Sequence, residues 1–252
     1  MRPKPTGPPK SDNLTLASLD LNDISFKSGG NGVLDQALLA LIHVLVFVYW
    51  LGGDLGAFYT SHFLTQADVP ADRRLLAAKV VGDVDMAPRT ALILALPTGL
   101  LLAQSKGWLA LGWPIVIGIT FAALAWLALA WHLHLKHGAA SNTLRTLDLG
   151  IRWVLVIGLS AWALLGLTGS VQLPLFLAFK LLALVGCVLL GLFIRSVLKP
   201  LGPALMGLSG PNAAAAEADL AATLNRARPL VTGIWVLLLI AAFLGLWTPT
   251  SF

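Results

Sequence analysis

The sequence predicts an all-α fold, a polytopic transmembrane helix bundle of about six spans with both termini outward. Of its 252 residues, 57% are hydrophobic and 12% are charged, whereas soluble domains carry about 45–50% apolar and about 25% charged residues. The mean hydropathy is +0.82, and apolar stretches of about 20 residues, the length that crosses a bilayer core, recur along the chain. This composition excludes a water-soluble globule.

Residues 1–32 are interpreted as a flexible N-terminal tail. Pro and Gly are concentrated at both of its ends, and the segment lacks the short apolar core of a cleavable signal peptide. The middle of the tail, residues 14–26, mixes apolar and polar side chains, which suits either a membrane surface or a disordered segment.

The transmembrane bundle is expected over residues 33–248. The second span extends backwards to Arg73, so the first two spans form an antiparallel hairpin that projects beyond the bilayer, and Pro88 and Pro97 start or kink the second helix. The Ala-rich linker 200–228 predicts a short cytoplasmic surface helix. The expected spans are 34–63, 85–105, 108–133, 149–169, 172–198 and 229–247.

The distribution of Lys and Arg predicts the orientation, because positive loops are retained in the cytoplasm. Five lie on the side of the N-terminus and eleven on the opposite side, and Lys180, inside a span, completes the 17. Both termini therefore face outward from a bacterial-type inner membrane. The basic residues are scattered among apolar runs, which argues against a nucleic-acid partner. The first group is Arg2, Lys4, Lys10, Lys27 and Lys106, and the second is Arg73, Arg74, Lys79, Arg89, Lys136, Arg145, Arg152, Arg195, Lys199, Arg226 and Arg228.

One face of the first span combines polar and aromatic side chains. His43 and Asp54 are eleven residues apart, roughly three helical turns, and Phe47 and Trp50 lie between them on the same face. Lys180 is expected about 12 Å below the outer surface and His43 about 13 Å below it, so the two can meet. Because both prefer to be protonated, such a pair needs an anionic partner, for which a haem propionate, a quinone oxygen or a carboxylate substrate qualifies. The alternatives are a His43 that bonds a backbone carbonyl and a Lys180 that extends to the near interface.

A second polar layer is expected near the cytoplasmic surface. Asp54, Asp85 and Arg89 fall at similar depths in the hairpin. Asp148, Arg152 and Arg195 reach the same level from the fourth and fifth spans. Two interpretations stay open. One is an ion-pair belt that fixes helix packing, and the other is a proton or ion pathway towards His43.

The run HLHLKH places His132, His134 and His137 at the inner end of the third span. Imidazole is a common ligand of Zn, Cu and Fe, but His132 lies about 200° around the helix from His134, so a metal site needs another helix. His62 and Asp148 are the candidates to complete it. The alternative is a polar cap at the membrane surface. The only cysteine, Cys187, excludes a disulfide or a Cys-based metal site within the chain.

Three segments carry a family resemblance: LIHVLVFVYWLGGDLGAFYTSHF, DMAPR and FKLLALVGCVLLGLFIR. They resemble the CopD-like copper-resistance membrane domain and the related HemJ-like membrane proteins, which oxidise protoporphyrinogen and are thought to bind haem b. The resemblance implies that His43 and Lys180 serve haem or substrate. The chain departs from the HemJ-like pattern at Ala178, where a histidine is expected, and this departure argues against ligation by two histidines.

Three hypotheses follow. The first is a membrane oxidoreductase or electron-transfer protein that binds one b-type haem or a quinone-like ring in its outer half. Its cofactor-binding residues are His43, which is also the metal ligand, Phe47, Trp50, Lys180 and Arg195.

The second hypothesis is an ion or copper-type permease in which Asp54, Asp85, Arg89 and Asp148 do the catalytic work of gating or relaying charge. No nucleotide-binding loop is present, and methionines suited to copper are few, namely Met1, Met86 and Met206. The third is a membrane anchor for a soluble redox partner that docks on the basic inner surface.

Overall fold

The computed structural model describes residues 31–136 and 141–249, and all the regular structure in these ranges is helical. The fold class predicted from the sequence is confirmed. Six of the helical segments are long and apolar enough to cross a membrane, so the chain is a multi-pass membrane protein. The helices are α1 (Asn31–Ser61), the short 3-10 helix η2 (His62–Thr65), α2 (Ala71–Val84), α3 (Met86–Ser105), α4 (Trp113–Leu135), α5 (Asn142–Leu167), α6 (Leu175–Val197), α7 (Leu201–Gly207) and α8 (Ala213–Trp247).

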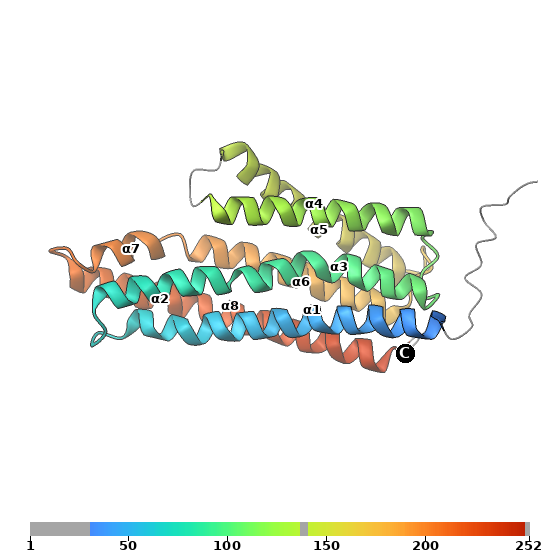
Figure 1. The fold of residues 1–252 in the computed structure, drawn as a ribbon, viewed down its shortest axis with the longest axis horizontal. Coiled ribbons are helices and arrows are strands. Elements are labelled where there is room, and N and C mark those ends of the chain that lie inside the picture. The colour runs from blue at the N-terminus through green and yellow to red at the C-terminus, as the bar shows by residue number, and fades with distance from the viewer. Residues whose placement is uncertain (1–30, 137–140, 250–252) are drawn as a thin grey trace, which may run out of the picture.

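The two ends of the described chain lie at the same end of the bundle, as an even number of spans requires (Figure 1). α1 begins and α8 finishes there. We call this the outer end, following the orientation predicted from the positive charges, and the opposite end the inner end. α1, α4 and α5 leave many large apolar side chains exposed, so these helices present a surface to lipid.

The hairpin expected from the first two spans is present and projects at the inner end. α2 and α3 are separated only at Asp85, Pro88 lies in the first turn of α3, and Pro97 lies inside that helix. Gly53 of α1 packs so closely against the start of α3 that an added Cβ would lie 2.7 Å from side-chain atoms of Ala87 and Pro88. This close contact fixes the position of the inner half of α1 relative to the start of α3.

The linker helix predicted over 200–228 takes a different form. α7 occupies its first part, but the Ala-rich part is the beginning of α8, which runs without a break through Pro229 into the last span. Its high helix propensity and its packing outweigh the backbone hydrogen bond that a proline removes. This inner extension has its own small core of Leu64, Ala204, Leu205, Leu220 and Leu224.

Two predicted boundaries move for local reasons. The third span begins at Trp113 rather than at 108, because Gly112, with φ of +79°, ends the preceding turn and Pro114 starts the helix. The fourth begins at Asn142 rather than at 149, because the Ser141 hydroxyl accepts a hydrogen bond from the backbone N–H of Leu144 and caps the helix.

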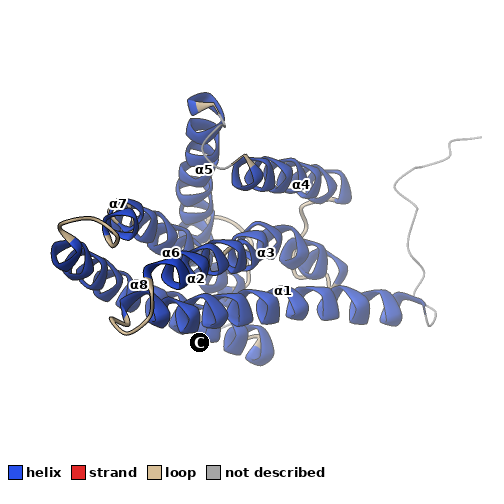
Figure 2. Cartoon of the chain, turned by 60° about the vertical axis from the view of Figure 1, so that its left-hand side comes forward, coloured by secondary structure: helices blue, strands red, loops and turns tan. Residues whose placement is uncertain are grey.

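The helices form a central group with two flanking members. The central group consists of α1, α3, α6 and α8. The flanking helices are α4, which lies against α3, and α5, which lies against α6. Both α4 and α5 lie away from the centre of the bundle (Figures 1 and 2). Side chains that point into the central group from these four helices are enclosed by protein on several sides.

Candidate functional site

A cavity of about 470 Å³ lies in the outer half of the central group, mainly between α1, α3, α6 and α8. Its size is within the range of about 300–1,000 Å³ that is typical of small-molecule sites. The lining is dominated by Leu, Ala, Val and aromatic side chains. Among the described residues that line it, the charged or ionisable side chains are His43, Lys106, Lys180 and Cys187, and none is acidic.

His43 lies on the α1 wall, and its tautomer follows from its hydrogen bonds. The Nδ1 atom is 2.9 Å from the Thr98 hydroxyl on α3, and that hydroxyl donates its own hydrogen to the carbonyl of Leu94 at 2.7 Å. The hydroxyl oxygen can therefore only accept from the ring, so Nδ1 carries the hydrogen and Nε2 keeps a free lone pair. This bond to a hydroxyl replaces the carbonyl bond that the sequence left open.

The ring of His43 rests on the backbone of α3. An added Cβ at Gly99 would lie only 3.2 Å from Cε1 of the imidazole. A glycine at this position therefore gives the ring its place between the two helices.

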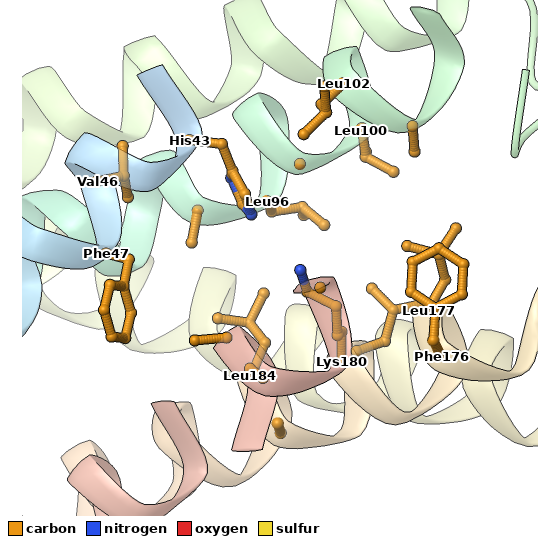
Figure 3. Close-up of a pocket in the computed structure, with 18 of the residues that line it drawn as sticks. His43, Val46, Phe47, Leu96, Leu100, Leu102, Phe176, Leu177, Lys180 and Leu184 are labelled. Atoms are coloured by element: carbon orange, nitrogen blue, oxygen red, sulfur yellow. The ribbon is translucent and has the colours of Figure 1, made fainter. Parts of the chain in front are cut away.

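Lys180 faces His43 from the α6 side, and the imidazole and the amine point toward one another across the cavity (Figure 3). Within the described ranges, the amine has no hydrogen-bond or ion-pair partner. Its place is made by Gly245 of α8, where an added Cβ would lie 2.7 Å from Nζ. The side chain thus points into the cavity, toward His43.

Aromatic side chains form both ends of the cavity. Phe47 and Trp50 line it as the sequence predicts, and Trp50, only 3% exposed, lies toward the inner end. At the outer rim, Lys106 sits over the ring of Trp108 at 4.8 Å, and Trp108 packs edge-on against Phe176 with ring centroids 5.0 Å apart.

Sequence reasoning missed Lys106 and Cys187 as lining residues. Lys106 looked like an ordinary loop cation and Cys187 like one of many apolar positions in α6. No spacing in the sequence distinguishes them, because the rotation of α3 and α6 about their axes decides what each helix presents to the cavity.

The structure places Arg195 outside the cavity, which corrects its assignment to a cofactor-binding set. Its guanidinium donates to Asp148 at 2.9 Å. Asp148 also accepts from Trp126 at 2.8 Å and from Arg152 at 3.1 and 3.3 Å. This buried cluster joins α4, α5 and α6 near the inner end, where long side chains meet in the same layer. Asp148 is fully engaged, as in the ion-pair belt interpretation.

The expected network of Asp54, Asp85 and Arg89 forms only in part. Asp85 and Arg89 are an ion pair one turn apart on the same helix. Asp54 is only 9% exposed, and its Oδ2 atom has no hydrogen-bond partner in the structure. The three residues share a level, as predicted, but the cation pairs with one carboxylate alone.

The histidine-rich end of α4 does not assemble a metal site within the described residues, where no group of three His, Cys, Asp or Glu side chains is placed to hold an ion. His134 lies 3.4 Å from Asp83, and His62 contacts Arg228 at 3.0 Å. His134 and His62 thus contact different residues, Asp83 on α2 and Arg228 on α8. His137 lies outside the described residues.

No protein-family model, curated protein or solved structure matches the chain.

Proposed function

We propose that this chain is a membrane redox protein whose cavity binds one flat, apolar ring with anionic substituents, with b-type haem as the leading candidate and a quinone-like ring as the alternative. The observation that carries the proposal is the pair His43 and Lys180, which face each other across an apolar cavity without an acidic lining residue among those described. Basic groups held together away from water are tolerated when an anion joins them.

The residues present fit haem. His43 offers a free Nε2 lone pair, and the hydrogen bond from its Nδ1 to Thr98 is the kind of outer contact that orients metal-binding histidines. It would be the single protein ligand, which agrees with the missing histidine at Ala178. When bound, haem supplies one-electron redox chemistry.

The other lining residues have separate duties in this proposal. Phe47 and Trp50 form walls against the ring, and the surrounding aliphatic side chains exclude water. Lys180 binds one anionic substituent inside the cavity, and Lys106 binds a second at the rim. A ring with two acidic groups therefore fits the lining better than a neutral one, which is why haem is preferred to a quinone.

The resemblance to HemJ-like and CopD-like proteins remains part of this proposal, and the facing of His43 and Lys180 supports it. An ion or copper-type permease has less support, because Asp85, Arg89 and Asp148 are engaged in ion pairs within the chain. A role as an anchor for a soluble redox partner has no specific contact in its favour.

A haem titration of the purified protein tests the proposal. We expect the wild type to bind one haem per chain with a shifted Soret band. His43→Ala should abolish the shift, and Lys180→Met should weaken binding about tenfold or more, because it removes a charge-assisted contact. His62→Ala, whose ring lies outside the cavity, is the matched control and should bind normally. The same titration with a quinone analogue examines the alternative ring.

Two results would overturn the proposal. One is a wild type that binds neither haem nor a quinone analogue. The other is haem binding that His43→Ala and Lys180→Met leave unchanged.

A further inference from the structure

Asp54 lies directly beneath the inner end of the cavity. It follows Trp50 by one helical turn on the same face of α1, and Trp50 lines the cavity. The Asp54 side chain is buried, and one of its carboxylate oxygens has no hydrogen-bond partner. Buried polar atoms are nearly always paired, so an unpaired carboxylate oxygen in this position requires an explanation.

The surroundings connect this carboxylate to both the cavity and the inner surface. The tight packing of Gly53 against Ala87 and Pro88 brings Asp54 to the junction of α2 and α3. There it is within electrostatic range of Asp85, whose side chain is 36% exposed. On the other side it is within electrostatic range of Cys187, which lines the cavity. Asp54 thus lies between water and the ligand site.

No cation in the described part of the chain neutralises Asp54. Arg89, at the α2–α3 junction, pairs with Asp85. On α8, Arg228 contacts His62 and Asn225. On α6, the nearby ionisable group is the thiol of Cys187. Because no positive group balances this buried carboxylate, further negative charge in the nearby cavity favours its binding of a proton.

We propose that Asp54 is a proton-exchanging residue that couples the inner aqueous side to the charge in the cavity. When an external one-electron donor adds one electron to the cavity, the Asp54 carboxylate binds one proton that comes from inner water past Asp85. When an external one-electron acceptor removes the electron, Asp54 releases one proton to inner water. The proton on Asp54 therefore compensates the negative charge that the electron adds to the cavity. The coupling rests on the proposed redox function, whereas the exchange itself does not.

The exchange can be measured without any cofactor. Infrared spectra of the ligand-free protein, recorded over a pH series, should contain the carbonyl band of a buried carboxylic acid that shifts in heavy water. Asp54→Asn should remove this band. Asp83→Asn, which removes an exposed carboxylate on α2, should leave it in place. If the wild type lacks the band, or if Asp54→Asn retains it, the proposal is overturned whether or not haem binds.

The coupling can be measured on the haem-loaded protein by redox titration with mediator dyes. We expect reduction to raise the proton affinity of Asp54 about tenfold, so that the midpoint potential falls by about 59 mV between its low-pH and high-pH plateaus. In Asp54→Asn the midpoint potential should not change with pH, and in Asp83→Asn it should depend on pH as in the wild type. Asp85→Asn should keep the plateaus but slow proton uptake, followed with an indicator dye.

The outcomes separate this proposal from the proposed function. A haem-loaded wild type with a pH-independent potential, or the same pH dependence in Asp54→Asn, overturns the coupling and leaves haem binding intact. Absence of haem binding overturns the proposed function, and the infrared result still decides the exchange. Should Asp54→Asn fail to fold, Asp54→Glu replaces it in the infrared experiment. If the carbonyl band of Asp54→Glu then titrates over the same pH range as that of the wild type, the proposal for Asp54 is overturned.

Discussion

At the scale of single residues, the site depends on how few polar groups the cavity contains. His43 has a defined tautomer because the Thr98 hydroxyl hydrogen is already donated to the Leu94 carbonyl. Lys180 has its place because Gly245 has no side chain. In each case a small neighbour on the facing helix determines what the functional group can do.

The hydrogen bond to His43 gives the first prediction. Thr98→Val removes the acceptor for Nδ1 while keeping the side-chain shape, so the ring loses its fixed orientation. Losing such an outer contact lowers metal affinity about 10- to 100-fold, and we expect a fall of this size in haem affinity, measured by Soret titration. Thr120→Val, which removes a similar hydroxyl-to-carbonyl bond within α4, is the control. Equal effects of the two variants would assign the loss to helix stability.

At the scale of elements, close packing of α1 on α3 sets the depth of the polar groups. Gly53 has no room for a Cβ, whereas its neighbour Gly52 has no atom within 4 Å of such a Cβ. The two glycines are adjacent, and the sequence alone does not distinguish them. Only one of them lies in the helix interface.

This difference gives the second prediction. Gly53→Ala should destabilise the protein by about 1–3 kcal/mol, because overpacking forces the helices apart. Gly52→Ala should be neutral or stabilising by up to about 1 kcal/mol, because alanine has the higher helix propensity. Thermal unfolding in detergent measures both. Similar Tm values for the two variants would contradict the interface described here.

At the scale of the whole molecule, the two ends of the bundle differ in structure and charge. The outer end holds the cavity, and the inner end carries the projecting α2, α7 and first half of α8 with most of the positive charge. The positive-inside rule therefore predicts that the extension faces the cytoplasm.

The third prediction tests this orientation. Ser170 lies in the connection between α5 and α6 at the outer end, and Ser209 lies between α7 and α8 at the inner end, and both are exposed. In intact cells, Ser170→Cys should react with a membrane-impermeant maleimide, and Ser209→Cys should react only after permeabilisation. The native Cys187 is 2% exposed and should give little background. A reversed labelling pattern would show that the termini face the cytoplasm.

Much of the fold follows from the sequence because few backbone structures are stable in the hydrocarbon of a membrane. Backbone groups in hydrocarbon must bond within the chain, so each apolar stretch of sufficient length becomes a helix. That His43 and Lys180 can face each other could be predicted for the same reason, since the rise per residue of a helix is fixed. The starts of α4 and α5 do not follow from hydropathy, because Gly112 and Ser141 act through a local turn and a helix cap.

The sequence by itself determined the helical class, the number of membrane-spanning segments, the shared side of the termini and the two levels of polar residues, because length and apolarity decide these. Only the tertiary structure decided which polar groups meet. It turned Lys180 toward His43, directed Arg195 to Asp148, and left one carboxylate oxygen of Asp54 without a hydrogen-bond partner. These outcomes depend on how each helix is rotated and how closely it packs, and small residues on neighbouring helices, far away in the sequence, control both.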